Sequence, residues 1–414
     1  MIQISEDKKR LLSNFFSLSV LQGLNMILPL IILPYLVRVL GVENFGLISF
    51  VLANIMYFDI FVGFGFELSA TREVSIHRND SLKVSYIFSS VMILKLFFFF
   101  ISLGILSVMI ILIDNFRENM QLYYATFGLI FGNMLFPIWF FQGMEQMKYI
   151  TYINLFVKII FTVLIFIFVQ DASDYIFVPL LTSLGTITAG MISLWIIFKY
   201  FDIQFFWPGW QYIIERFKES YPFFLSQMAT HGSRYYATTL IGIHFSLTMV
   251  GYYTMVEKLY YAFKSSAGII SQTLYPYMSR TKNIVFFKKI FFWVIIGTSL
   301  LMPPFLYFRV EILDLIFNVN NEMLSNLFLI IFSGSIFGLA STLLGFPLLA
   351  AFDYAKYANN GMIYTAFIYI IFITVSILLT KSIYFTAWAL VVDNVCSLLI
   401  GVYYIRKTKI WKIN

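Results

Sequence analysis

The segment 86–112, YIFSSVMILKLFFFFISLGILSVMIIL, decides the fold class, because a single charged residue, Lys95, interrupts its apolar character. A helix of about 20 apolar residues crosses the roughly 30 Å of hydrocarbon in a bilayer. The whole chain shares this character, since 60% of its 414 residues are hydrophobic and 12% are charged, against about 25% charged residues in soluble domains. The sequence therefore predicts an all-α polytopic membrane protein.

Similar apolar runs recur along the chain and predict twelve transmembrane helices. The predicted spans are 14–37, 45–66, 86–112, 121–143, 150–169, 175–198, 222–243, 247–274, 290–308, 324–350, 359–379 and 384–405. The longest polar connection, 199–221, separates an N-terminal six-helix lobe at 1–198 from a C-terminal six-helix lobe at 222–414. Two halves with equal numbers of spans predict parallel repeats. The connection itself fits an interfacial amphipathic helix or an ordinary aromatic belt.

The basic residues outside the spans are divided unequally between the two sides of the membrane. In the twelve-span arrangement, 19 Lys and Arg residues lie on the side of both termini, and four, at positions 38, 117, 309 and 381, lie on the other. The positive-inside rule therefore places both termini and the connection 199–221 in the cytoplasm. All outer loops are short, which counts against polysaccharide polymerases and ligases and against a folded enzyme domain.

Residue types that carry metal, redox or nucleotide chemistry are sparse. One cysteine, Cys396, and three scattered histidines make a disulfide or a metal site a poor expectation. No P-loop, G-x-S-x-G or H-E-x-x-H motif occurs, so we expect no ATP binding, no catalytic residue and no cofactor. The segment Gly63-Phe64-Gly65-Phe66 ends a span and is interpreted as a helix terminus. The net charge of +7 follows from the basic residues that flank the spans and does not indicate nucleic acid.

Five cations lie inside the predicted spans, where each costs about 2.5–3.5 kcal/mol on insertion scales. Lys95 and Lys158 are expected to reach the membrane surface along their own stems. Arg234 lies roughly 18 Å into the seventh span at 1.5 Å per residue, beyond the reach of either surface. The polar residues on the same helical stripe are Gln227, Thr230, His231 and Thr238. We expect this stripe to face water or a ligand, and a buried structural ion pair is the alternative.

Polar residues also gather on the first, second and eighth spans. Glu257 and Lys264 share one face of the eighth span, with Lys258 beside it, and the second span contains Asp59. The first span ends at Arg38, and its polar stripe contains Asn14, Ser17, Gln22, Asn25 and Pro29. Spans one, two, seven and eight are equivalent pairs in the two halves, which predicts that they face a shared central cavity.

The charges of this set predict the kind of ligand. The cations Arg38, Arg234, Lys258 and Lys264 outnumber the acids Asp59 and Glu257 by two. Arginine binds phosphate with two parallel hydrogen bonds, and lysine adds a point charge. The predicted ligand is therefore an anion such as a phosphate or pyrophosphate, and a carboxylate or a nucleotide satisfies the same electrostatics.

Short motifs along the chain carry a family resemblance. They are Leu33-Pro34-Tyr35-Leu36, Arg38-Val39-Leu40-Gly41 with Phe45-Gly46, Tyr57-Phe58-Asp59, Gly63-Phe64-Gly65-Phe66, Ser69-Ala70-Thr71-Arg72-Glu73, Val250-Gly251-Tyr252-Tyr253 and Glu257-Lys258-Leu259. With these motifs and its topology, the chain resembles the Wzx-type polysaccharide flippases, which belong to the multidrug/oligosaccharidyl-lipid/polysaccharide (MOP) exporter superfamily.

The resemblance implies a V-shaped transporter of twelve helices in the bacterial inner membrane. Such a protein moves an undecaprenyl-pyrophosphate-linked oligosaccharide, an O-antigen or similar repeat unit used in lipopolysaccharide biosynthesis, from the cytoplasmic to the outer leaflet by alternating access. No covalent chemistry is involved, and a polysaccharide polymerase is an implied partner.

The resemblance also implies roles for residues. The substrate-binding residues would be Arg38, Arg234, Lys258, Lys264, Gln227, Gln22 and Asn25, with Arg72 as a capture residue at the cytoplasmic mouth. A proton or sodium gradient would supply the energy, with Asp59 or Glu257 as the coupling carboxylate. A structural counter-ion role for both carboxylates is the alternative.

Two other functions compete with the flippase. A drug or cation antiporter of the same superfamily requires a net acidic cavity, whereas the residues above are net basic. A membrane-embedded glycosyl or acyl transferase requires paired carboxylates with supporting loops, which the sequence lacks.

Replacing Arg234 with alanine is expected to abolish surface polysaccharide, because the mid-membrane cation that engages the substrate is removed. Electrophoresis of the surface polymer measures the effect, and an immunoblot of the membrane fraction checks that the variant is still inserted. Normal polymer on cells that carry the variant would exclude Arg234 from the mechanism.

Overall fold

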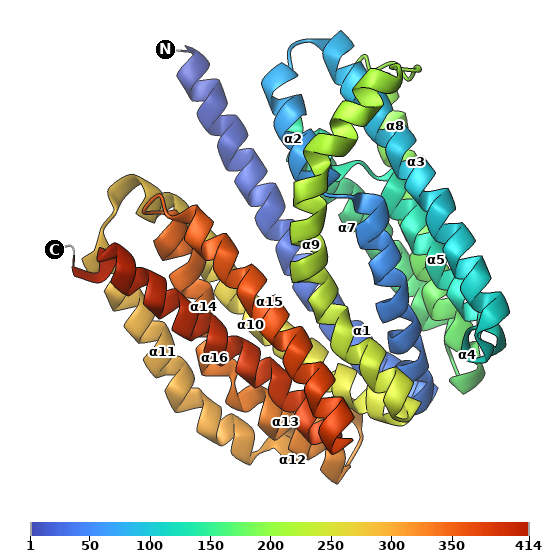
Figure 1. The fold of residues 1–414 in the computed structure, drawn as a ribbon, viewed down its shortest axis with the longest axis vertical. Coiled ribbons are helices and arrows are strands. Elements are labelled where there is room, and N and C mark those ends of the chain that lie inside the picture. The colour runs from blue at the N-terminus through green and yellow to red at the C-terminus, as the bar shows by residue number, and fades with distance from the viewer. Residues whose placement is uncertain (1, 413–414) are drawn as a thin grey trace. The chain divides into compact units, whose positions relative to one another are not determined.

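The computed structural model describes the backbone of residues 2–412 and the side chains of residue 23 and residues 28–411. Every regular element in this range is a helix, as Figure 1 shows. The α-helices are α1 (Ile2–Gly63), α2 (Phe66–His77), α3 (Ser81–Leu112), α4 (Asp114–Glu118), α5 (Met120–Leu135), α6 (Ile138–Gly143), α7 (Met147–Phe168), α8 (Phe177–Tyr200), α9 (Trp210–His244), α10 (Leu247–Thr281), α11 (Ile284–Tyr307), α12 (Arg309–Phe317), α13 (Glu322–Ser333), α14 (Ser335–Leu344), α15 (Ala355–Thr380) and α16 (Ile383–Thr408). Three short helical turns complete the set: η1 (Ala172–Ile176), η2 (Gly345–Ala350) and η3 (Ile410–Lys412).

Nine helical segments in the described part of the chain are long and apolar enough to cross a membrane. Eight of them coincide with predicted spans three to six and nine to twelve, and the ninth, Leu28–His77, continues across the connection predicted at 38–44. The helix is nevertheless interrupted inside that connection, because Gly41 has non-helical backbone angles (φ 77°, ψ 164°). The predicted seventh and eighth spans correspond to α9 and α10. These two helices fall outside the nine and contain the predicted intramembrane charges Arg234 and Glu257.

The described chain forms two compact units. The first unit contains residues 1–32 and Phe50–Tyr235, and the second contains Leu33–Ser49 and the residues from Tyr236 onward. These boundaries differ from the lobes predicted at 1–198 and 222–414, because α1 and α9 each contribute residues to both units. The division into six-helix lobes therefore stays a prediction.

The connection predicted at 199–221 is partly helical. Helix α8 ends at Tyr200, and α9 begins at Trp210 and continues through Pro222, so the predicted amphipathic helix is the first part of α9. The irregular stretch before it lies along α3, where the backbone amides of Gln204 and Phe206 donate to the hydroxyls of Ser85 (3.1 Å) and Ser89 (3.2 Å). These serine hydroxyls satisfy backbone groups that have no helical partner.

An ionic cluster joins α2 to the first turns of α9. The Arg216 guanidinium lies 3.4 Å from a carboxylate oxygen of Glu73 and 2.8 Å from one of Glu219. Next to it, the hydroxyls of Ser69 and Ser220 are 2.6 Å apart. Burial raises the pKa of the Glu219 carboxyl above its ordinary value, although Arg216 opposes this shift.

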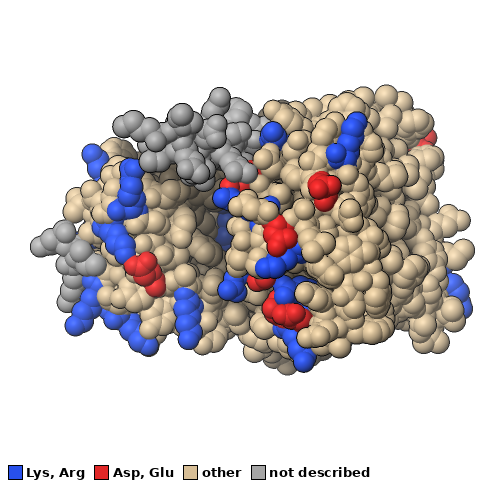
Figure 2. Space-filling model, turned by 90° about the horizontal axis from the view of Figure 1, so that it is seen from above, with Lys and Arg blue, Asp and Glu red and all other residues tan. Residues whose placement is uncertain are grey.

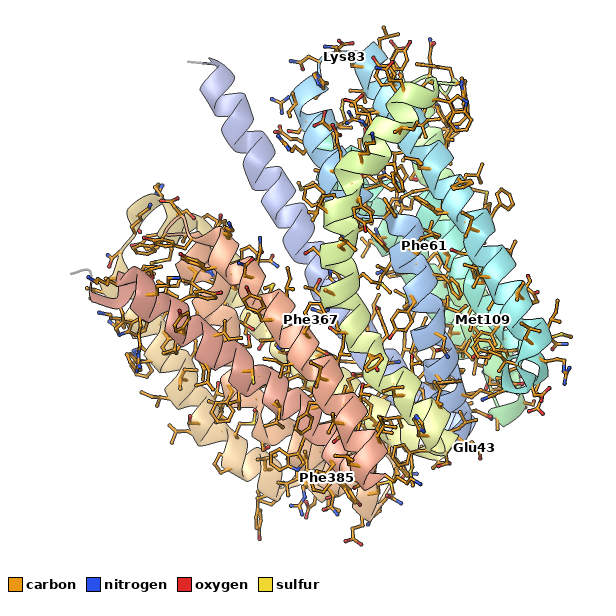
Figure 3. The ribbon with its side chains drawn as sticks, in the orientation of Figure 1. Glu43, Phe61, Lys83, Met109, Phe367 and Phe385 are labelled. Atoms are coloured by element: carbon orange, nitrogen blue, oxygen red, sulfur yellow. The ribbon has the colours of Figure 1, made fainter. Side chains whose placement is uncertain are left out.

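The same end of the first unit carries further charges. Arg78 forms an ion pair with Glu145 (2.6 Å). Lys83, labelled in Figure 3, lies close to the start of α3, and Met109 lies near the other end of that helix. Figure 2 views the molecule from the end at which Lys83 lies and shows Lys and Arg interspersed with Asp and Glu. Charged side chains at a helix end remain in contact with water.

The first unit is held together by a close helix pair, α5 and α8. A Cβ atom at Gly132 would lie 2.4 Å from the backbone of Thr186, so only glycine allows the two helices to approach this closely. The Ser183 hydroxyl donates to the Ala125 carbonyl across the same seam (2.6 Å). Small residues at such seams let helices pack backbone to backbone in a membrane.

A sharp elbow between α1 and α2 confirms the helix terminus predicted at 63–66. Phe64 and Gly65 both have positive φ (42° and 73°), which ends one helix and starts the next. The Phe64 ring stacks on Phe98 of α3 at 4.6 Å and on Phe224 of α9 at 4.7 Å between ring centroids. The elbow is thereby fixed against two other helices of the unit.

The second unit contains α10 to α16. One apolar core lies at the ends of several of these helices and includes Met278, Phe287, Leu348 and Ile410, all fully buried. Lys282 forms an ion pair with Asp353 beside this core. The α-helical pattern changes at Gly345–Ala350 to a single π-helical turn that contains Pro347.

Replacing Gly65 with alanine is expected to lower the free energy of unfolding by about 1–3 kcal/mol, because a non-glycine residue is strained at positive φ. The new Cβ would also lie 2.6 Å from the Cβ of Phe223. The melting temperature of the detergent-purified protein measures the loss. Gly104→Ala is the matched control, since nothing lies within 4 Å of its Cβ position. Equal melting temperatures for the two variants would show that alanine is not strained at position 65.

Candidate functional site

A cavity of about 270 Å³ lies within the first unit. It is lined by residues of α1, α2, α3, α5, α6 and α9, and Phe61, labelled in Figure 3, marks the part of α1 that contributes. The polar and aromatic lining residues are Asp59, Glu67, Lys95, Asn133, Trp139, Gln227, His231 and Tyr235. Two of these, Asp59 and Gln227, belong to the predicted site, and the structure brings them together at this cavity.

Asp59 is held by a neighbour on another helix. The side-chain amide of Asn133 donates to the Asp59 carboxylate at 3.0 Å. Asn133 follows Gly132, so the α5–α8 seam fixes its place. Directly beyond it, α5 ends at Leu135 and α6 begins at Ile138, on the far side of Pro137. A broken helix at membrane depth is tolerated where the irregular backbone lines a cavity.

Lys95 points into the protein, and its predicted reach to the membrane surface is wrong. Its exposed fraction is 5%, and it lines the cavity. Its charge interacts with those of Glu67 and Asp59, but no hydrogen bond or close ion pair joins it to any side chain that the structure describes. The reason for the error is geometric: α3 begins at Ser81, earlier than the predicted span, so Lys95 is further from the helix end.

The rim and wall of the cavity add polar groups of several kinds. Glu67, at the start of α2, and His231, on α9, are exposed, whereas Trp139 is fully buried. The Trp139 indole Nε1–H has no hydrogen-bond acceptor among the residues whose side chains are described. Tyr235 packs edge to face against Tyr57 of α1, with 6.5 Å between ring centroids.

The charge balance of this cavity differs from the predicted excess of two cations. Two carboxylates, Asp59 and Glu67, face one ammonium group, Lys95. The predicted balance was counted on Arg38, Arg234, Lys258 and Lys264, none of which lines this cavity. The lining of this cavity is therefore richer in acids than in bases.

Three of those cations belong to the second unit and have identified neighbours there. The Arg38 guanidinium donates to the carbonyl oxygens of Leu315 and Ile316 (both 2.7 Å), close to the carboxyl end of α12. The Lys258 ammonium lies 4.8 Å from the centre of the Phe45 ring. Lys264 donates to the Asn394 side chain at 3.0 Å.

The remaining predicted site residues are distributed over both units. Arg72 is exposed on α2, and Arg234 is exposed on α9, where its charge acts on His231. Glu257 is buried in α10, with an exposed fraction of 8%. The side chains of Gln22 and Asn25 lie outside the described residues.

Sequence reasoning missed Glu67, Asn133 and Trp139 and gave Lys95 too little weight. A signal was present for Asn133, because the G-x-x-x-G pattern at Gly128 and Gly132 marks a helix-packing seam beside it. For Lys95 the signal was a lone charge in an apolar run. Nothing in the sequence indicates that these residues converge, because their helices are far apart along the chain.

Replacing Asn133 with leucine is expected to lower the free energy of unfolding by about 1.5–3 kcal/mol, the usual range for a hydrogen bond to a charged group. In a double-mutant cycle with Asp59→Asn, the two effects should not add, since both substitutions remove one interaction. Asn154→Leu is the control, because the Asn154 amide donates within its own helix, to the Ile150 carbonyl oxygen (2.8 Å). Additive effects of Asn133→Leu and Asp59→Asn in thermal unfolding would refute the interaction.

Comparison with known proteins identifies relatives over most of the chain. Residues 11–282 match the family described as "Polysaccharide biosynthesis protein". The "Putative O-antigen transporter" of Escherichia coli K12 is 30% identical over 292 residues, which cover 69% of this chain and 70% of that protein. The protein of the same name from Shigella dysenteriae is 26% identical over 277 residues, which cover 67% of this chain and 69% of that protein.

Solved structures of other proteins share the fold. The lipid II flippase MurJ in an inward closed conformation has a TM-score of 0.71 at 14% identity, covering 97% of this chain and 89% of that chain. An inward-facing multidrug resistance MATE family transporter of the MOP superfamily has a TM-score of 0.67 at 14% identity, covering 94% and 96%. These matches confirm the predicted all-helical, multi-span MOP fold and the family resemblance. The chain is thus a multi-pass membrane protein that belongs to the polysaccharide biosynthesis protein family.

Proposed function

We propose that the protein is a flippase that moves an undecaprenyl-pyrophosphate-linked oligosaccharide, an O-antigen or similar repeat unit, from the cytoplasmic to the periplasmic leaflet. The observation that carries the proposal is the 30% identity to the Escherichia coli protein named for O-antigen transport, over 69% of this chain. The fold shared with the lipid II flippase supports it, because that protein is also named for moving a lipid.

The chemistry of such a substrate fits a protein with polar groups inside its helical units. The lipid tail can stay in the bilayer while the charged, hydrated head group crosses, and an isolated head group would lose its hydration in hydrocarbon. The protein has to replace those lost contacts. Asp59, Lys95 and Asn133 in the first unit, and Glu257 and Lys264 in the second, are groups that can do so.

The cationic residues are proposed to have different roles, because their exposure and their neighbours differ. Arg234 and Arg72 are exposed and are proposed to bind the pyrophosphate and to capture the substrate at the cytoplasmic mouth. Lys258 and Lys264 are proposed to add positive charge to the path of the head group. Gln227, Gln22, Asn25 and Arg38 complete the proposed binding set, and the Arg38 hydrogen bonds to α12 add a structural role.

We also propose that transport is driven by a proton or sodium gradient. Asp59 and Glu257 are the candidate coupling groups, because a carboxylate inside a membrane unit can exchange a cation between the two sides. Alternating access requires a change in the relative position of the two units during each cycle. No bond of the substrate is made or broken, so the proposed activity is transport and not catalysis.

The proposed setting is the cytoplasmic membrane of a bacterium, with both chain termini in the cytoplasm. The unequal distribution of basic residues supports this orientation. A polysaccharide polymerase on the far side of the membrane is the proposed consumer of the translocated unit.

A drug or cation antiporter is the second candidate, and one observation favours it. The first unit's cavity contains two carboxylates and one ammonium group, the net acidic character that a cationic substrate prefers. The fold shared with a multidrug resistance transporter is compatible with this function. The relatives named for O-antigen transport favour the flippase.

The decisive experiment reconstitutes the purified protein in liposomes with a labelled lipid-linked oligosaccharide. Flipping should exceed that of protein-free liposomes and accelerate when a pH or sodium gradient is imposed, because the coupling ion then moves downhill. Asp59→Asn and Glu257→Gln should lose the gradient dependence. Chromatography of the extracted lipid checks that the substrate is chemically unchanged.

Each contrary result has a definite meaning. A rate of flipping that neither gradient changes would make the protein a passive facilitator. A rate equal to that of protein-free liposomes would exclude the flippase. A new covalent product would favour the transferase, and efflux of organic cations without lipid flipping would favour the antiporter.

A further inference from the structure

We infer that a polar stripe buried in the second unit is a hydrated pathway that carries protons to and from Glu257. This inference rests on the proposed function, because it names the ion that the Glu257 carboxylate exchanges and the residues that deliver it. Three observations carry it: the alignment of polar side chains along α10, the buried polar groups that join them from other helices, and the chemistry of those groups.

The stripe follows one face of α10. Tyr253, Glu257, Tyr260 and Lys264 succeed one another at steps of three and four residues, which places them on the same side of the helix. The exposed fractions of the first three are 0%, 8% and 1%, so this face points into the unit. At 1.5 Å per residue the stripe is roughly 16 Å long. It therefore extends over about half of the hydrocarbon thickness of a bilayer.

Helix α15 adds a group at one end of the stripe. Tyr369 is buried and lies beside Tyr253, which also interacts with Glu257. The three side chains form a row from α15 to the carboxylate. A tyrosine hydroxyl both donates and accepts hydrogen bonds, so it can take up a proton on one side and give one up on the other.

Helices α14 and α16 shape the other end of the stripe. The Lys264 ammonium donates to the Asn394 side-chain oxygen at 3.0 Å. A Cβ atom at Gly338 of α14 would lie 2.6 Å from the Tyr260 hydroxyl and 2.8 Å from the same Asn394 oxygen. The glycine thus leaves the space in which these two polar groups lie, inside an otherwise apolar unit.

Four buried polar atoms of the stripe make no hydrogen bond of normal geometry within the described part of the chain. They are the hydroxyls of Tyr253, Tyr260 and Tyr369 and the amide nitrogen of Asn394. Leaving buried polar groups unsatisfied is costly. Ordered water satisfies such groups in protein interiors, with about three hydrogen bonds for each molecule. Water between these side chains joins them into a hydrogen-bonded chain, the kind of structure that relays protons through membrane proteins.

The chemistry of the stripe favours a proton over a metal cation. A hard cation requires several oxygen ligands, but Lys264 offers only donors, and its hydrogen bond occupies the Asn394 oxygen. A proton requires one acceptor and a chain of hydroxyls or waters that leads to it. It forms an O–H bond on the Glu257 carboxylate, while each hydroxyl on the way releases one proton, takes up another and is left unchanged.

Other helices bring few charges to the stripe. Helices α13 and α14 and the turn η2 pack against α10, and their one charged residue is Glu322, in the first turn of α13. The α1 segment Leu33–Ser49 places the Phe45 ring, and not a charge, next to Lys258. The titratable groups close to Glu257 and its row on α10, α15 and α16 are Tyr253, Lys258, Tyr261, Tyr369 and Asp393.

The test follows protonation of Glu257 in the purified full-length protein in nanodiscs, by rapid-mixing infrared spectroscopy after a jump to acidic pH. The carboxylic-acid band that the wild type gains and Glu257→Gln lacks reports this group. The band should form at least twofold more slowly in heavy water, because O–H bonds break along the path. Its final amplitude should be the same in sodium chloride and in choline chloride. A lower amplitude in sodium chloride would show a metal ion at the carboxylate and overturn the inference.

Matched variants locate the pathway. Tyr253→Phe combined with Tyr260→Phe removes a hydroxyl on each side of the carboxylate and keeps both rings. The band should then form at least tenfold more slowly, with an unchanged final amplitude, and each single substitution should give an intermediate rate. Tyr275→Phe combined with Tyr364→Phe is the control, because these rings on α10 and α15 are 40% and 50% exposed. Melting temperatures show whether each variant is folded. A purely structural role for Tyr253 and Tyr260 would lower the melting temperature without slowing the band.

The outcomes separate this inference from the proposed function. If the wild type flips the lipid-linked substrate but Glu257 stays charged after the acid jump, the inference is wrong and the flippase stands. The same conclusion follows if the variants at Tyr253 and Tyr260 gain the band at the wild-type rate. If Glu257 is protonated as expected and no lipid is flipped, the proton pathway stands and the flippase is wrong.

Discussion

A charged side chain inside the bilayer has to be hydrated, paired or surrounded by polar groups, because hydrocarbon cannot replace the hydrogen bonds that the side chain makes with water. The first unit meets this requirement around Asp59 and Lys95. The Asn133 amide donates to the Asp59 carboxylate, and Lys95 is buried in the same cavity with Glu67 at its rim. The elbow at Phe64–Gly65 and the break between α5 and α6 give these residues a cavity to face.

The close packing of α5 and α8 at their glycine seam also supports the arrangement around Asp59. Because Gly132 lets α8 approach closely, the neighbouring Asn133 is held at a fixed position opposite Asp59. The stacked rings around Phe64 hold the elbow on the other side. Packing and polar contacts in this unit are therefore mutually dependent: a change in the seam or the elbow moves the groups that line the cavity.

The fold alone does not decide between substrates. Proteins named for lipid II flipping and for multidrug resistance share it at 14% identity, so the fold is compatible with very different cargo. Sequence similarity to proteins named for O-antigen transport narrows the choice.

The sequence by itself determined that the chain crosses the membrane repeatedly, since long apolar runs have only one stable environment, and it located the helix terminus at 63–66 from its glycines. It also predicted that Asp59 and Gln227 belong to a polar site. It did not reveal that Lys95 is buried, that Arg38 donates to the end of α12, or that α1 and α9 contribute to both units. Those features depend on contacts between helices that are distant along the chain. Hydropathy is a property of one segment, whereas the partner of a charged residue is chosen by tertiary packing.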